Sequence, residues 1–228
     1  MFLALFSLLV RNPALASVST SEEIYLSKHG VYYQIFVRAF ADGDGDGLGD
    51  LRGIINNLDY LEELGVGGIW LTPIHPSPTY HKYDVMDYYA VDREVGTLDD
   101  FRELVKKAHE RGIKVIIDLV LNHTSSRHPW FISAALNPQS QYRDYYIWAE
   151  EDTNIRALGP WGQRVWHAQG RDHYYGLFWD GMPDLNYDNP AVRAEAKAIA
   201  EFWLKQGADG FRLDAAMHIF AHSEPARA

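Results

Sequence analysis

The 228-residue chain contains no cysteine. Disulfide bonds and thiolate metal sites are therefore excluded. Basic residues are also scarce, with 21 Lys and Arg against 31 Asp and Glu, which gives a formal net charge of −10. Because proteins bind phosphate backbones through an excess of Lys and Arg, this charge disfavours a nucleic-acid partner.

Long apolar runs are missing as well. The longest N-terminal run covers residues 2–10, whereas a membrane-spanning helix needs about 20 apolar residues. The run is followed by Ala14-Leu15-Ala16, a small-x-small pattern typical of a signal-peptide cleavage site. A buried N-terminal helix is the alternative. We predict a signal peptide over residues 1–16 and a secreted or periplasmic protein without membrane contact after its removal.

Aromatic residues, in contrast, are plentiful: seven Trp and fourteen Tyr contribute to an aromatic content of 14%. Flat amphipathic rings suit the faces of sugars, although most such rings fill cores or interfaces. The composition therefore permits a carbohydrate ligand without requiring one.

Apolar strand-like segments alternate with amphipathic helical segments along the chain. The strand-like segments cover residues 31–40, 67–73, 113–123 and 209–218, and the helical segments cover residues 51–65, 97–112 and 189–207. Strand–helix repetition with strands buried on both faces predicts an α/β protein with a parallel sheet. An open doubly wound sheet and a closed barrel both satisfy this pattern. The first strand lacks a following G-x-G-x-x-G turn, which weakens the dinucleotide-binding version of the open sheet.

The third and fourth strands are separated by a much longer stretch than the other pairs. Most of the excess lies in residues 124–186, which are rich in Trp, Tyr, His, Asn and Gly and show no clear period. A loop of this length inside a compact domain is usually functional or a small subdomain of its own. It leaves from the C-terminal end of a strand, where barrel enzymes build their active sites.

Polar residues gather at the ends of the third and fourth strands. The third ends in Asp118, Asn122 and His123, and the fourth carries Arg212 and Asp214. Arg212 and Asp214 are two residues apart, so both side chains point to the same face of a strand. A guanidinium beside a carboxylate keeps it ionised, as a nucleophile requires. A structural ion pair is the alternative.

Short segments of the chain resemble signature regions of the α-amylase superfamily of glycoside hydrolases. They are "DLVLNH" (118–123), "MPDLN" (182–186) and "GFRLDAAMH" (210–218), and residues 29–220 read like this family throughout. The resemblance implies a (β/α)8 TIM barrel whose catalytic domain covers residues 29–123 and 187–228, with an inserted subdomain B at 124–186 between strand three and its helix. Because such a barrel needs about 250 residues, we expect truncation after about strand four.

The resemblance also assigns roles to individual residues. Asp214 matches the nucleophile of a retaining double displacement, Arg212 the arginine that keeps it ionised, and Asp118 a structural support for that arginine. Sugar contacts are implied for His81, Tyr83, His123 and His218. Lys82 departs from the family pattern, which has a glycine there. The sequence of residues 182–186 places the chain between oligo-1,6-glucosidases and neopullulanases, and "DAAMH" favours α-1,4-glucan or maltooligosaccharide as substrate.

A retaining glycosidase also needs a general acid, which this family carries after strand five. We therefore expect the 228-residue chain to be inactive alone and poorly soluble. A non-catalytic carbohydrate-binding or scaffold relative of the amylase fold is the alternative function.

The acidic stretch "ADGDGDGLGDLRG" (41–53) predicts a metal loop. An EF-hand is excluded because position 12, which needs a bidentate Glu, is Gly53. Oxygen ligands for one structural Ca²⁺ are available from Asp42, Asp44, Asp46 and Asp50 and from the Leu48 carbonyl. The same spacing is a metal loop in oligo-1,6-glucosidase-like members of the family. Asn122 and Asp184 match ligands of a second, weaker calcium site in many amylases.

Overall fold

The computed structural model describes residues 30–220. The predicted signal peptide, residues 1–16, lies outside the described residues. Within residues 30–220, no helix combines the length and the apolarity that a membrane crossing requires.

One parallel sheet organises the chain. Its strands are β1 (Tyr32–Ile35), β2 (Gly68–Leu71), β3 (Lys114–Leu119) and β6 (Gly210–Leu213), hydrogen-bonded in that order. The predicted α/β class with a parallel sheet is confirmed. The first predicted strand is shorter than expected, because residues after Ile35 turn into the one-turn helix α2 (Val37–Phe40).

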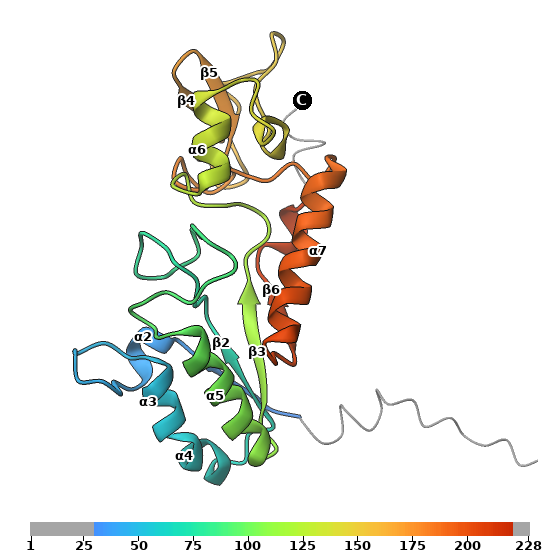
Figure 1. Cartoon of the computed structure of the whole chain (residues 1–228). Coiled ribbons are helices and arrows are strands. Elements are labelled where there is room, and N and C mark those ends of the chain that lie inside the picture. The colour runs from blue at the N-terminus through green and yellow to red at the C-terminus, as the bar shows by residue number, and fades with distance from the viewer. Residues whose placement is uncertain (1–29, 221–228) are drawn as a thin grey trace, which may run out of the picture.

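Two helices that connect the strands lie within the predicted helical segments 97–112 and 189–207. Thr97 and Asp100 form a capping box for α5 (Leu98–Glu110), and the Asn189 side chain caps α7 (Pro190–Lys205). Figure 1 shows α5 beside α3 (Leu51–Asn56), and the two helices contact each other.

The predicted helix over residues 51–65 is instead two short helices, α3 and α4 (Leu58–Glu63). The break falls at Asn57, which has φ −113° and ψ 16°. Its side-chain amide donates to the Gly53 carbonyl at 2.8 Å. Asparagine competes for backbone groups in this way, and it therefore interrupts a helix that the apolar spacing alone would continue.

Residues 124–186 contain their own small elements. These are α6 (Pro129–Leu136), the 3₁₀ turn η1 (Arg143–Tyr145) and an antiparallel pair, β4 (Trp166–Gln169) with β5 (Asp172–Tyr175). In Figure 1 α6, β4 and β5 lie beyond the end to which the β3 arrow points. A separate apolar cluster supports this region, formed by Val165, Trp166, Tyr175 and Leu177. The boundaries of subdomain B remain a prediction.

The sheet is buried unevenly. Ile117 and Leu119 of β3 are almost completely covered, whereas Leu213 of β6 is 51% exposed. In the described part of the chain, β1 and β6 are the edges of this sheet. Strand edges without a neighbouring strand are pairing surfaces, so the sheet formed within residues 30–220 has two such edges.

A fully buried histidine lies in the core between the sheet and α7. The ring of His75 is 5.1 Å from that of Trp203 and 6.1 Å from that of Tyr88, centroid to centroid. Its Nδ1 lies 3.2 Å from the Ala90 carbonyl oxygen, which requires an N–H at that nitrogen. Burial lowers the pKa of His75 to about 4.

This histidine makes stability depend on pH. The folded pKa lies below the unfolded value of 6.5, so between the two values the unfolded chain binds more protons. The free energy of unfolding should therefore fall by up to about 3 kcal/mol as pH drops from about 6.5 to about 4. Urea unfolding across this range measures the slope. His75→Gln keeps a donor for Ala90 but cannot titrate there, so it should make the slope smaller, while the buried His123 and His128 keep contributing to it. An unchanged slope would contradict the assignment to His75.

Candidate active site

A charged cluster lies at the C-terminal ends of β3 and β6. Parallel pairing sets Asp118 opposite Arg212. Nη1 of Arg212 donates to Oδ1 of Asp118 at 2.9 Å and to Oδ1 of Asp214 at 2.5 Å. The exposed fraction of the side chain is 0% for Asp118, 17% for Asp214 and 37% for Arg212. The guanidinium therefore joins a fully buried carboxylate to one that solvent and ligands can reach.

Asp118 is surrounded by donors. Besides Arg212, the Tyr83 hydroxyl donates to Oδ2 at 3.0 Å and the Trp70 indole N–H donates to the same oxygen at 3.3 Å. Burial raises the pKa of Asp118, and the Arg212 and Tyr83 hydrogen bonds oppose that rise. Trp70 was missed from the sequence, where its place in an apolar strand gives no sign of a polar partner.

Two predicted histidines lie around Tyr83. His123 is buried, and its Nε2 lies 3.1 Å from the Tyr83 carbonyl oxygen. Burial lowers the pKa of His123 to about 4, so the ring is neutral near pH 7. His81 accepts a hydrogen bond from the Tyr83 backbone N–H at Nδ1, 3.1 Å away. Tyr83 is thus the common neighbour of Asp118, His81 and His123.

Lys82 adopts a left-handed backbone conformation, with φ 61°. Glycine enters this region at little cost, whereas for another residue it costs of order 1 kcal/mol or more. The Lys82 side chain is buried, and its Nζ lies 2.8 Å from Oδ2 of Asp92 and 3.2 Å from Oε2 of Glu94. This ion pair offsets the strain, which explains how lysine replaces glycine beside Tyr83.

His218 lies in the short turn that follows Asp214. It ends the 3₁₀ turn η2 (Ala216–His218), which begins directly after the left-handed Ala215 (φ 49°). The His218 ring contacts those of Trp161 and Phe178, and Phe178 in turn contacts His123 with centroids 5.2 Å apart. The structure therefore connects His218 to the other predicted residues through aromatic rings that the sequence did not single out.

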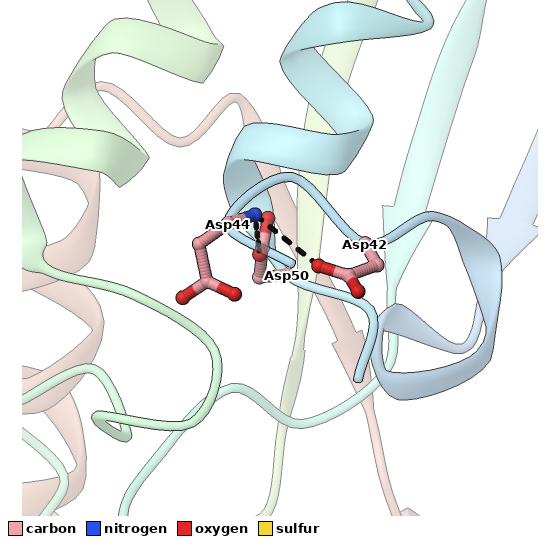
Figure 2. A group of neighbouring side chains, drawn as sticks. All are labelled: Asp42, Asp44 and Asp50. Carbon is pink, nitrogen blue, oxygen red and sulfur yellow. Dashed lines mark hydrogen bonds between the residues drawn. The ribbon is translucent and has the colours of Figure 1, made fainter. Parts of the chain in front are cut away.

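The acidic loop brings together part of the predicted metal site. Carboxylate oxygens of Asp42, Asp44 and Asp50 lie within 4.8 Å of one another, and Asp46 lies outside this group. Figure 2 shows the Asp44 backbone nitrogen donating to both Asp42 and Asp50, at 3.2 Å in each case. Backbone N–H groups of Gly45 and Gly47 lower the pKa of Asp42. The Leu48 backbone N–H donates to Asp46 at 2.8 Å.

The loop is fixed to the start of α3. Asp50 caps this helix by accepting from the Gly53 N–H at 2.6 Å, and its other oxygen accepts from the Gly43 N–H at 3.0 Å. A Cβ at Gly53 would lie 1.8 Å from the Ala41 carbonyl oxygen, so only glycine fits there. The clustered oxygens suit a hard cation such as Ca²⁺.

The second predicted metal pair is Asn122 and Asp184. Both side chains are buried where the chain after β3 contacts residues 182–186. Asp184 accepts from the Leu177 N–H at 3.1 Å, and burial raises the pKa of Asp184 to about 7. Oδ1 of Asn122 has no hydrogen-bond partner in the described part of the chain. A buried oxygen without a partner beside a buried carboxyl group fits the ligand chemistry of a hard cation.

A parallel α/β sheet with an Asp–Arg–Asp cluster at its C-terminal edge is the arrangement of an α/β-barrel enzyme. Residues 34–227 match the family model described as "Alpha amylase, catalytic domain". The chain therefore belongs to the α-amylase family of glycoside hydrolases, as the signature segments predicted.

Individual relatives support this membership. The chain is 53% identical over 193 residues to Alpha-amylase 3 of Dictyoglomus thermophilum, covering 85% of this chain and 38% of that protein. It is 49% identical over 193 residues to Trehalose-6-phosphate hydrolase of Escherichia coli, covering 82% and 35%. The crystal structure of the alpha-amylase from H. orenii is similar with a TM-score of 0.80 and 59% identity, over 86% of this chain and 42% of that one. The chain thus spans less than half the length of these relatives.

The Asp118–Arg212 pair should be strongly coupled. Arg212→Met leaves Asp118 buried without its cation, and we expect a loss of about 3 kcal/mol in the free energy of unfolding. Asp118→Asn combined with Arg212→Met should cost less than the sum of the single changes, because no buried charge remains unpaired. Urea unfolding of the four proteins measures the coupling. Strict additivity would show that the two side chains act independently.

Proposed function

We propose that the chain carries the nucleophile half of a retaining α-glucan hydrolase. The observation that supports it is the position of Arg212, whose guanidinium hydrogen-bonds both the buried Asp118 and the partly exposed Asp214. A guanidinium fixed in this way orients one carboxylate oxygen of Asp214 and leaves the other for chemistry. A non-catalytic sugar-binding relative would not need this arrangement.

The chemistry follows from the two carboxylate roles of a retaining glycosidase. A carboxylate oxygen of Asp214 attacks the anomeric carbon as the bond to the leaving oxygen breaks, and a general acid protonates that oxygen. Water then attacks the same carbon, loses its proton to the former acid, and releases Asp214. The general acid belongs about 5–5.5 Å from the nucleophile, and we assign this role to none of residues 30–220.

Neighbouring residues would hold the sugar at the cleavage position. The Tyr83 hydroxyl donates to Asp118 at 3.0 Å, which holds the ring in position. The face of this ring would then contact the sugar. His123 is neutral and fixes the Tyr83 loop through the carbonyl contact, and His81 fixes the Tyr83 backbone. We propose that these rings, together with His218, bind the α-glucan substrate.

An α-1,4-glucan or maltooligosaccharide is the proposed substrate. Among the relatives, one is an alpha-amylase and another a trehalose-6-phosphate hydrolase. A phosphorylated sugar requires basic side chains for its phosphate, and the chain has a net charge of −10. The acidic balance therefore supports a neutral glucan.

We further propose that residues 124–186 form subdomain B between barrel segments 29–123 and 187–228, and that the protein is secreted or periplasmic. The separate apolar cluster around Trp166 supports the first proposal. The small-x-small pattern before Ser17 supports the second.

The acidic loop is proposed to bind one structural Ca²⁺ through Asp42, Asp44 and Asp50, with Asp46 and the Leu48 carbonyl as outer candidates. Such an ion would stabilise the turn between β1 and α3, because the same Asp50 caps that helix. Asn122 and Asp184 would hold a second ion between β3 and residues 182–186.

The nucleophile can be tested without a general acid. A glucosyl fluoride that carries a second fluorine at C5 loses fluoride unprotonated, so Asp214 alone can form the glycosyl-enzyme. We expect intact mass spectrometry to show one glycosyl adduct, mapped by peptide analysis to Asp214. Asp214→Asn should abolish the adduct, because an amide is a far weaker nucleophile. Asp99→Asn, on the exposed face of α5, is the matched control and should still be labelled. Labelling that persists in Asp214→Asn would disprove the assignment.

The metal loop can be tested by thermal unfolding. Calcium at about 100 times its dissociation constant stabilises a protein by about 2.7 kcal/mol, so Tm should rise by several degrees over the value measured in chelator. Asp44→Asn should remove most of this shift, because Asp44 belongs to the oxygen cluster. Asp46→Asn should remove less, since Asp46 lies outside it. Equal Tm values with calcium and with chelator would refute the site.

A further inference from the structure

Lys82 is held by a buried network of ion pairs that takes no part in the proposed chemistry. Its side chain is 4% exposed, and Nζ lies 2.8 Å from Oδ2 of Asp92, whose side chain is 9% exposed. The same Nζ lies 3.2 Å from Oε2 of Glu94, which also pairs with the Arg38 guanidinium at 3.0 Å. Arg38 belongs to α2, which follows β1. The network therefore ties residue 82 to two other segments of the chain.

Backbone groups fix the Asp92 carboxylate independently of the lysine. Oδ1 of Asp92 accepts from the Glu94 backbone N–H at 2.9 Å, and Oδ2 accepts from the Ser77 backbone N–H at 3.3 Å. The Asp92 backbone N–H donates to the carbonyl of Ile74, a core residue, at 2.8 Å. A carboxylate held in this way has little freedom to move. The position of the Lys82 side chain is therefore set by Asp92.

Lys82 lies between two residues of the proposed sugar-binding site. The Tyr83 backbone N–H donates to Nδ1 of His81 at 3.1 Å, which closes a turn across residue 82. The two rings lie 5.9 Å apart, centroid to centroid, with planes inclined by 37°. The Tyr83 hydroxyl reaches Asp118 at 3.0 Å. This turn depends on the backbone conformation of Lys82, which is left-handed with φ 61°.

A buried lysine fixes this turn more firmly than a glycine would. Glycine enters left-handed and right-handed conformations about equally readily, so it would permit the turn without selecting it. A lysine at this position is strained, and its long side chain loses rotamer freedom on burial. The ion pairs with Asp92 and Glu94 offset both costs only while the backbone keeps the conformation that lets Nζ reach them. The anchored side chain therefore selects one backbone conformation for the segment that carries Tyr83.

We propose that Lys82 is a positioning residue for the sugar-binding residues His81 and Tyr83. Anchored on Asp92, it holds the turn of residues 81–83 in its binding conformation before the sugar arrives. Binding then does not have to order this segment, and affinity rises because that cost is avoided. Lys82 acts through Tyr83 and touches neither the sugar nor Asp214. This inference rests on the proposed function, since it takes His81 and Tyr83 to contact the sugar at the cleavage position.

The test measures how fast the glucosyl fluoride with a second fluorine at C5 labels Asp214 of the 228-residue chain. Varying the reagent concentration separates the half-saturating concentration, KI, from the maximal rate, kinact. Lys82→Met/Asp92→Asn removes the ion pair and leaves neither side chain as an unpaired buried charge. We expect KI to rise about tenfold, because the Tyr83 turn must then be ordered on binding. The maximal rate should stay within about twofold, because Asp214 and Arg212 are unchanged. Lys82→Gly/Asp92→Asn permits the turn without selecting it and should raise KI severalfold.

The ion pair of Lys114 and Asp209 provides the matched control. Lys114 begins β3, whereas Asp118 lies near the other end of that strand. Nζ of Lys114 lies 2.8 Å from Oδ1 of Asp209, whose side chain is 11% exposed. Lys114→Met/Asp209→Asn should keep the wild-type KI even if its Tm falls. A wild-type KI in Lys82→Met/Asp92→Asn would overturn the proposal, because a lysine that only stabilises the fold would behave like this control.

Hydrogen–deuterium exchange distinguishes this inference from the catalytic proposal, because it needs no labelling. Backbone amides of residues 79–86 should exchange severalfold faster in Lys82→Met/Asp92→Asn than in the wild type, since the turn opens more often. The control variant should leave them unchanged. Where the wild type is labelled at Asp214, a change in KI or in exchange alone would overturn the role of Lys82 and leave the catalytic proposal standing. Faster exchange in the variant of a chain that is not labelled would support the positioning of Tyr83, while the catalytic proposal fails.

Discussion

The fully buried carboxylate of Asp118 is the constraint on which the rest of the site depends. A carboxylate without solvent is costly unless donors surround it. Here the donors come from three parts of the chain: Trp70 on β2, Tyr83 on the following loop, and Arg212 on β6. Because all three donors bond the Asp118 carboxylate, the segments that carry them are fixed relative to one another. The position of Asp214 then follows, because Arg212 satisfies both aspartates at once.

Parallel pairing makes this convergence possible. Residues that follow β2, β3 and β6 all emerge at the same edge of the sheet, so a polar cluster can form there while the strands remain apolar. The pairing of Asp118 with Arg212 is a direct consequence of the register between β3 and β6. The same edge receives residues 124–186, and Phe178 from this segment contacts His123 at the end of β3. The charged side chains come from the sheet and the residue after it, whereas Phe178 comes from residues 124–186.

Features that depend on neighbouring residues were predicted from the sequence more accurately than features that depend on contacts between distant segments. The capping box at Thr97 and the Asn189 cap act within one helical turn, and the helices that they begin lie within the predicted segments 97–112 and 189–207. The break at Asn57 was missed, because a side chain bonding to its own helix overrode the apolar spacing. The shared position of Arg212, on β6, and Asp214, the residue after β6, was predictable from their spacing of two. The ring contacts of Trp161 with Phe178 and His218 were not predictable, because they join segments far apart in the chain, which no local period encodes.

The charged cluster and the exposed aromatic surface come from different segments of the chain. The Asp118 carboxylate is shielded from water, so its interaction with Arg212 depends on fixed geometry. The Trp161 indole is 62% exposed and comes from residues 124–186. Because the two features come from separate segments, a change in the loop at Trp161 can leave the charges around Asp214 undisturbed.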